Sequence, residues 1–234
     1  MKIDRDTGAV LAGPFETVYV YEAPVRLWHW VMATCMVVLA ITGYLIGSPP
    51  PSVGGEASEH YVFGTIRFAH FTAAFVFAIM FVVRVYWAFV GNRWSRQIFV
   101  PPLWKVKWWR EMIEVQKYYA FMKEEGTAYV GHNPMAQAAM FFMYVLGTIF
   151  MIFTGFALYS EGLGRGSWAD RLFGWVIPLF GQSQDVHTWH RLGMWYLVLF
   201  TMIHLYLVFR EDIMSGATII STMVNGLRIF KKRS

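Results

Sequence analysis

The chain has 234 residues, of which 56% are hydrophobic, 18% aromatic and only 15% charged. Because soluble domains typically carry about 25% charged residues, this composition excludes a disordered chain, a collagen-like fibre and an ordinary water-soluble enzyme. The single cysteine, Cys35, excludes an internal disulfide, a cysteine-based zinc site, a cysteine-ligated iron–sulfur cluster and the Cys-x-x-Cys-His attachment of a c-type haem.

Four apolar runs are long enough to cross a bilayer, which takes about 20 residues of helix. They are Leu27–Ile46, Ile66–Val90, Pro134–Tyr159 and His190–Arg210. The runs lack strand-like alternation, and a backbone in lipid must satisfy its own hydrogen bonds, so we expect helices. The 26 residues before the first run are polar and charged, and we expect no removable signal peptide there. The sequence therefore predicts an all-α integral membrane protein, a four-helix bundle that forms a single domain over residues 1–234.

Lysine and arginine gather on one side of the predicted membrane topology. The N-terminal segment, the 91–133 loop and the tail from residue 210 carry three, seven and five of the 20 lysine and arginine residues. Four spans put these three segments on the same side, so the positive-inside rule places both termini in the cytoplasm. The net charge of +5 thus reflects topology, and we expect no nucleic-acid partner.

The cytoplasmic 91–133 segment contains a stretch, residues 103–123, that mixes Trp and Tyr with Lys and Arg. It is too charged to span the membrane. The pattern fits an amphipathic helix lying in the interface, and it fits equally well a solvated loop with anchoring aromatic residues.

Four of the seven histidines lie within the predicted spans, where ionisable side chains are costly and usually functional. The four are His29, His70, His190 and His204, and the other three are His60, His132 and His187. His190 and His204 are just under four helical turns apart, so both project from nearly the same face at depths about 21 Å apart. The topology puts His29 and His204 near the cytoplasmic side, and His70 and His190 near the outer side. The sequence therefore predicts two bis-histidine sites, one near each face.

Two imidazoles without a carboxylate or thiolate suit haem iron, which takes two axial ligands in its electron-transfer form, whereas zinc needs three or four ligands. Any one of these histidines could be a simple interfacial or helix–helix contact, but four that match pairwise in depth favour haem. Gly43 follows His29 on the same face, where it lets a flat macrocycle approach the backbone or allows helix–helix packing. His187 could replace His190, but it lies roughly 100° away from the face of His204.

Several stretches resemble the b-type cytochrome subunit of membrane-bound respiratory nickel–iron hydrogenases. They are Tyr21–Trp30 (YEAPVRLWHW), Thr42–Gly47 (TGYLIG), Arg84–Arg93 (RVYWAFVGNR), Gly131–Ala136 (GHNPMA), Thr154–Glu161 (TGFALYSE), His187–Trp195 (HTWHRLGMW) and Arg210–Gly226 (REDIMSGATIISTMVNG). The resemblance covers nearly the whole chain, and GHNPMA and the last stretch have no generic membrane explanation.

The resemblance implies a multi-pass subunit of the bacterial inner membrane that holds two b haems. Such a subunit takes electrons from the iron–sulfur small subunit of a periplasmic hydrogenase, which also has a large subunit, and passes them to membrane quinone. The family's haem ligands carry over onto His29, His70, His190 and His204. The chain has no motif for activating hydrogen itself, so we expect an electron-transfer subunit that is not catalytic alone.

Three other functions stay open from the sequence. The cytochrome b subunits of formate dehydrogenases share this four-helix layout. A transporter or proton channel could use the histidines as a relay, although the pairing in depth fits it poorly. An assembly or anchor subunit would need no cofactor at all.

Two arginines are expected near the haems. Arg84 lies 14 residues after His70, on the same helical face at the depth of the inner site, where it could pair with a haem propionate. It could equally extend to the cytoplasmic interface. Arg67, one turn before His70, is the corresponding candidate at the outer site.

The quinone is expected near the inner haem, because electrons enter from the outer side. His132, Asn133 and Gln137 open the third span on the cytoplasmic side and offer donors and acceptors for a quinone carbonyl. His132 could relay the proton that reduction takes up. The competing interpretation is a helix start, with Asn133 as the cap and Pro134 in the first turn.

Overall fold

The computed structural model describes residues 2–3, 10–11, 15–51, 61–123, 127, 129–215 and 217–231. The chain divides into two compact units. The bundle unit comprises residues 28–86 and 139–201, and the sheet unit comprises residues 1–27, 87–138 and 202–234.

Four helices are long and apolar enough to cross a membrane. They are α1 (Ala23–Gly47), α2 (Val62–Val90), the continuous segment Pro134–Leu163, and α8 (Ser183–Ser215). The third is made of α4 (Pro134–Ala139), a π-helical segment η2 (Met140–Val145) and α5 (Leu146–Leu163). The four predicted spans are therefore confirmed as helices, and all four extend several residues beyond the apolar run that marked them.

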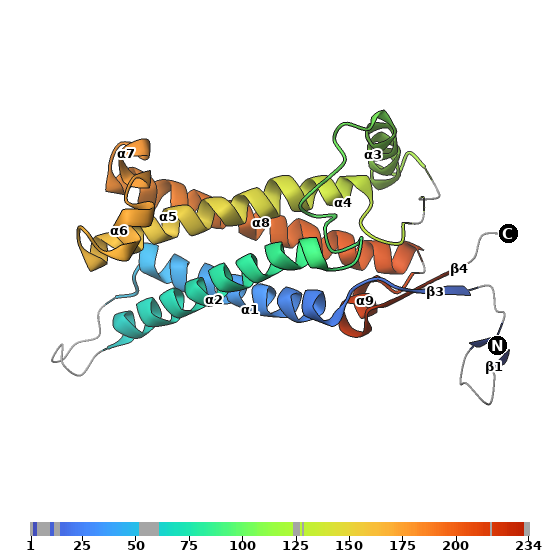
Figure 1. Ribbon diagram of the computed structural model, residues 1–234, viewed down its shortest axis with the longest axis horizontal. Coiled ribbons are helices and arrows are strands. Elements are labelled where there is room, and N and C mark those ends of the chain that lie inside the picture. The colour runs from blue at the N-terminus through green and yellow to red at the C-terminus, as the bar shows by residue number, and fades with distance from the viewer. Residues whose placement is uncertain are drawn as a thin grey trace. The chain divides into compact units, whose positions relative to one another are not determined.

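Within the bundle unit the four long helices lie side by side (Figure 1). Contacts join each helix to the next and the last to the first: Thr42 to His70 between α1 and α2, Phe75 to Phe156 between α2 and α5, Thr154 to His190 between α5 and α8, and Arg191 to Ser48 between α8 and the end of α1. Large apolar side chains cover the outside; Phe68 and Val82 are 72% and 67% exposed. Such a surface suits lipid rather than water.

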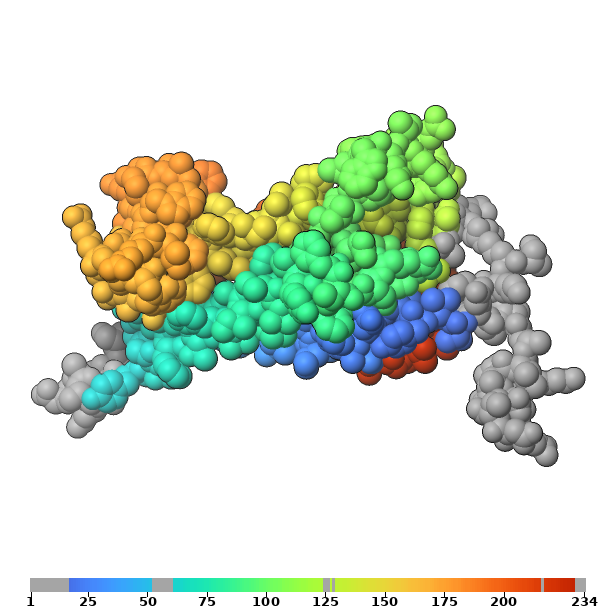
Figure 2. All heavy atoms as spheres, viewed as in Figure 1, coloured from blue at the N-terminus to red at the C-terminus, as the bar shows by residue number. Residues whose placement is uncertain are grey.

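Two short helices fold back on α5 after the third span. They are α6 (Trp168–Phe173) and α7 (Val176–Phe180), and Figure 2 shows their side chains, in orange, gathered over one end of α5. Phe173 stacks on Phe156 with ring centroids 5.1 Å apart, and Trp168 packs against the same ring at 5.9 Å. The Ser167 hydroxyl caps α6 by accepting from the Asp170 amide at 3.2 Å.

The sheet unit joins the two ends of the described chain. Strand β3 (Phe15–Tyr19) pairs antiparallel with β4 (Leu227–Lys231), with Tyr19 opposite Leu227. A second small pair is β1 (Lys2–Ile3) with β2 (Val10–Leu11). Gly226 makes the turn from α9 (Ile219–Asn225) into β4 at φ +84°, a backbone conformation that favours glycine. The sequence analysis predicted none of these strands.

The 103–123 stretch contains a helix, α3 (Val106–Tyr119). Trp108, Val115 and Tyr118 are buried along one side, while Lys107 and Lys117 are exposed. This pattern agrees with the amphipathic helix of the sequence analysis rather than with a plain loop. Its place at a membrane surface stays a prediction.

Candidate functional site

His70 is held in the bundle unit by the Thr42 hydroxyl of α1. The distance from His70 Nδ1 to Thr42 Oγ1 is 2.9 Å. Thr42 Oγ1 also lies 2.6 Å from the Val38 carbonyl oxygen one turn earlier, to which it donates. A hydroxyl has one hydrogen, so towards His70 the oxygen accepts and Nδ1 carries the proton. The lone pair of the neutral ring then lies on Nε2.

His190 is held in the same way by the Thr154 hydroxyl of α5. The distance from His190 Nδ1 to Thr154 Oγ1 is 2.8 Å, and Thr154 Oγ1 donates to the Phe150 carbonyl oxygen at 2.8 Å. Thr154 is 1% exposed. The His190 ring therefore also carries its proton on Nδ1 and its lone pair on Nε2.

A glycine follows each threonine and makes room for the ring. A Cβ on Gly43 would lie 3.3 Å from His70 Cε1, and one on Gly155 would lie 3.1 Å from His190 Cε1. Both separations are tighter than ordinary carbon contacts. Gly43 thus borders the His70 imidazole, and the expected approach of a macrocycle at Gly43 stays a prediction.

Both imidazoles belong to the bundle unit. His70 is fixed from α1 and His190 from α5, through Thr42 and Thr154. His70 and His190 are the pair that the sequence predicted for the outer site, and they come from different helices of one bundle.

The predicted inner ligands fall in different units. His29, on α1, is half-buried in the bundle unit, and His204, on α8, is half-buried in the sheet unit. Their pairing stays a prediction that rests on the sequence spacing.

Arg84 points into the bundle unit. It is 3% exposed, and its guanidinium carbon lies 5.1 Å from the Trp28 ring centroid. The expectation that Arg84 faces the interior is confirmed, whereas its pairing with a propionate stays a prediction. Arg67 is exposed, with its guanidinium carbon 5.7 Å from the Phe71 ring centroid.

The expected quinone residues lie together at the start of α4 in the sheet unit, and each makes hydrogen bonds within the protein. Asn133 Oδ1 accepts from the Ala136 amide at 2.8 Å, which is the cap that the competing interpretation predicts. Asn133 Nδ2 donates to the Tyr119 hydroxyl at 2.8 Å. Residues 132–137 therefore have a structural role, and their quinone role stays a prediction.

Gln137 and His132 also form hydrogen bonds at the start of α4. Gln137 Oε1 accepts from Trp108 Nε1 at 3.0 Å, and Gln137 Nε2 donates to the His132 carbonyl oxygen at 2.9 Å. His132 Nδ1 lies 3.1 Å from the Tyr21 hydroxyl. Trp108 and Tyr119 both belong to α3, so the side chains that start α4 also dock α3.

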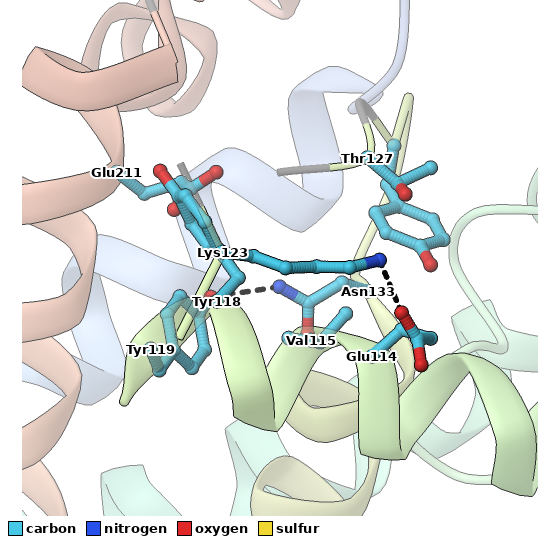
Figure 3. A pocket seen from close by; sticks show the side chains of 9 residues that line it. Glu114, Val115, Tyr118, Tyr119, Lys123, Thr127, Asn133 and Glu211 are labelled. Atoms are coloured by element: carbon cyan, nitrogen blue, oxygen red, sulfur yellow. Dashed lines mark hydrogen bonds and ion pairs between the residues drawn. The ribbon is translucent and has the colours of Figure 1, made fainter. Parts of the chain in front are cut away.

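A small polar cavity lies beside Asn133 (Figure 3). It has a volume of about 20 Å³, room for one water. Figure 3 shows the Asn133 amide directed at Tyr119 and the Lys123 ammonium at the Glu114 carboxylate. Lys123 and Lys117 hold the pKa of Glu114 below its ordinary value, while burial raises the pKa of the Tyr119 phenol.

Comparison with known proteins identifies the family. The model of the prokaryotic cytochrome b561 family matches residues 20–226. The chain belongs to this family. A protein of Azotobacter chroococcum mcd 1 is 62% identical over 214 residues, 92% of this chain and 89% of that protein. One from Cupriavidus necator is 56% identical over 227 residues, 97% and 93% of the two chains.

A third cytochrome b561 relative comes from Escherichia coli (strain K12). It is 51% identical over 217 residues, 91% of each chain, and is named a probable Ni/Fe-hydrogenase 1 B-type cytochrome subunit. The other two are named probable Ni/Fe-hydrogenase B-type cytochrome subunits. The resemblance inferred from the sequence is thereby confirmed, and the cofactor of a b-type cytochrome is haem b.

The His70–His190 pair of this cytochrome b561 fits haem b. Two neutral imidazoles from opposite helices, each with its Nε2 lone pair available, are the donor set that six-coordinate haem iron takes. The hydrogen bond at Nδ1 is the usual way in which a protein orients a histidine ligand. His70 and His190 would hold this haem.

One other histidine in the described part of the bundle, His187, has no such setting. His187 is exposed on α8, which agrees with the preference for His190. His60 lies outside the described residues.

Thr42 and Thr154 are the site residues that the sequence analysis missed in this cytochrome. The signal was present, because a Thr-Gly pair occurs in both TGYLIG and TGFALYSE. Each pair precedes its histidine, by 28 and 36 residues from threonine to histidine. The unequal spacing hides the repetition from a search for a fixed period.

Proposed function

We propose that this cytochrome is the electron-transfer subunit of a membrane-bound nickel–iron hydrogenase in the bacterial inner membrane. It takes electrons from the iron–sulfur small subunit on the periplasmic side and delivers them to quinone near the cytoplasmic side. The observation that carries the proposal is the His70–His190 pair, two neutral imidazoles fixed by matching hydrogen bonds in one bundle. The names of the relatives support the hydrogenase partner.

Two haem sites follow from the histidines. His70 and His190 hold the outer iron, and His29 and His204 hold the inner iron, with Arg84 near the inner one and Arg67 near the outer one. Each bound haem supplies a centre that gains and loses one electron reversibly. The protein orients the imidazoles, surrounds them with apolar helices and keeps water away.

Histidine substitution tests the two sites. His190→Ala and His70→Ala should each leave one haem per chain, and His29→Ala should remove the other haem, because an iron with one axial ligand is weakly held. The measurement is haem content and the optical spectrum of the purified membrane complex. His187→Ala is the matched control, since His187 is an exposed histidine on the same helix as His190.

Three outcomes contradict the proposal. Two haems retained in all three ligand variants would exclude the ligand assignment. A colourless protein would favour a histidine-relay transporter, and quinone reduction unaffected by the substitutions would favour a cofactor-free anchor. Co-purification with a molybdenum or tungsten enzyme, in place of a nickel–iron enzyme, would indicate a formate dehydrogenase subunit.

Quinone is proposed to bind at the start of α4, through Asn133 and Gln137, with His132 supplying a proton path. The amide N–H groups that would donate to a carbonyl now donate to the Tyr119 hydroxyl, from Asn133, and to the His132 carbonyl oxygen, from Gln137. A quinone that uses them must take over one of these hydrogen bonds, because the cavity beside Asn133 has room for only a water-sized group. Binding would then be accompanied by a local shift of α3.

A test of the quinone proposal must separate loss of the two amides from loosening of α3. Asn133→Ala combined with Gln137→Ala should impair quinone reduction while both haems stay bound and reducible by hydrogen. Tyr119→Phe combined with Trp108→Phe removes the two hydrogen bonds that join these amides to α3 but keeps both amides, so it should leave quinone reduction largely intact. Equal losses in the two double variants, or normal turnover in the first, would place the quinone elsewhere.

A further inference from the structure

The Thr-Gly pairs repeat one local arrangement in both halves of the bundle. Thr42 and Gly43 of α1 hold His70 of the following span, and Thr154 and Gly155 of α5 hold His190 of the following span. In both cases the threonine hydroxyl bonds Nδ1, and the glycine leaves space for Cε1 of the same ring. The two threonines are 8% and 1% exposed, so water does not compete for these hydrogen bonds.

The arrangement fixes two properties of each ring. The hydroxyl hydrogen goes to the carbonyl one turn earlier, at 2.6 Å for Thr42 and 2.8 Å for Thr154. The oxygen therefore accepts from Nδ1, which selects the tautomer with a free Nε2. The adjacent glycine lets the ring edge lie against the helix backbone, so the rotation of the ring is restricted as well.

We infer that Thr42 and Thr154 are positioning residues that present His70 and His190 to a single haem iron and lower its reduction potential. This inference rests on the proposed function, which pairs these two histidines. Neither threonine ligates the iron; each acts through its histidine.

The direction of the effect follows from the hydrogen bond. An acceptor at Nδ1–H makes the imidazole a stronger electron donor through Nε2. A stronger donor stabilises the ferric over the ferrous state, so the potential falls. Removing the acceptor should raise the potential of this haem and leave that of the other haem unchanged.

The experiment uses the purified complex with Thr42→Val, Thr154→Val and the corresponding serine variants. Valine has the shape of threonine without the hydroxyl, and serine keeps the hydroxyl. Both valine variants should retain two haems and shift the same one of the two midpoint potentials upwards, with a change in one low-spin ferric resonance signal. The serine variants should return the potential towards that of the unmodified protein.

Thr34→Val is the matched control. Thr34 lies on α1 and its hydroxyl donates to the Trp30 carbonyl oxygen one turn earlier at 3.0 Å, but its side chain is exposed. Neither potential should change in this variant.

The outcomes separate this inference from the proposed function. If His70→Ala removes one haem but neither valine variant moves a potential or a resonance signal, the threonine role is overturned while the proposed haem site stands. If Thr42→Val and Thr154→Val move different potentials, the two histidines do not share an iron, and both the inference and the proposed pairing fail. If a valine variant loses its haem, the serine variant must recover it; failure to do so overturns the inference.

Discussion

Arg84 shows how a single residue can mark the interior of a membrane bundle. Burying a guanidinium among apolar helices is costly unless its surroundings compensate the charge. The Trp28 ring, with its centroid 5.1 Å from the guanidinium carbon, supplies part of that compensation through its negative face. A haem propionate would supply more, and the spacing from His70 puts Arg84 at the depth of the proposed inner haem.

Replacing Arg84 should therefore shift the inner-haem potential. A positive charge stabilises the reduced centre, and at roughly 10 Å and an effective dielectric of about 20 a unit charge contributes about 2 kcal/mol. Arg84→Gln should lower the inner-haem potential or weaken haem retention, and Arg84→Lys should restore most of both. Redox titration of the two haems is the measurement.

Arg67→Gln gives the comparison for Arg84. Arg67 is exposed, so solvent and lipid headgroups screen its charge, and its effect on the outer-haem potential should be smaller. Unchanged potentials in Arg84→Gln would show that the buried charge does not act on a haem.

At the scale of elements, α3 is held by side chains at the start of the third span. Trp108 and Tyr119, near the two ends of α3, donate to Gln137 and accept from Asn133 respectively. Two hydrogen bonds spaced along a 14-residue helix fix its direction as well as its position. Burial of Trp108, Val115 and Tyr118 adds an apolar contribution.

Trp108→Phe should loosen α3 without unfolding the protein. A lost hydrogen bond of this kind costs about 1 kcal/mol, and Gln137 Oε1 is left without its tryptophan donor. Amide hydrogen exchange over residues 106–119 should accelerate about fivefold. Trp109→Phe is the matched control, because Trp109 is 44% exposed and its Nε1 donates only to the nearby Leu103 carbonyl oxygen; equal exchange in the two variants would contradict the docking role of Trp108.

At the scale of the whole molecule, the membrane topology is the property that the charges predict. If all four helices cross the membrane, residues 91–133 fall on the same side as both termini, and this predicted side carries most of the lysine and arginine. The proposed direction of electron transfer depends on this topology, because it puts His70 and His190 on the periplasmic side.

Cysteine labelling tests the topology. In a Cys35→Ala background, Gln182→Cys should react with a membrane-impermeant maleimide in intact spheroplasts, and Lys105→Cys should react only after the membrane is opened. Both positions are exposed, so reactivity reports the side of the membrane. The reverse pattern would invert the topology and the proposed direction of electron flow.

The four helices and the histidines worth testing could be predicted from the amino-acid sequence. A backbone in lipid has to be helical when it does not form a closed barrel, and helical geometry then fixes which residues share a face and how far apart they lie. The pairing of His70 with His190 could therefore be predicted from counting, whereas the inward direction of Arg84 was one of two interpretations. The amphipathic pattern of α3 could also be recognised in the sequence, although a helix was only one of two interpretations of that stretch.

Only the tertiary structure revealed the partners of these residues. The bonds from Thr42 to His70 and from Thr154 to His190 join residues 28 and 36 positions apart, and strand β3 meets β4 from the far end of the chain. The same is true of Asn133 and Gln137, whose polar atoms could bind a ligand or another helix with equal chemistry. Local sequence does not predict such partners, because a hydroxyl or an amide can form the same hydrogen bonds with many different groups. The packing of helices that are distant in sequence decides which of these groups lies within reach.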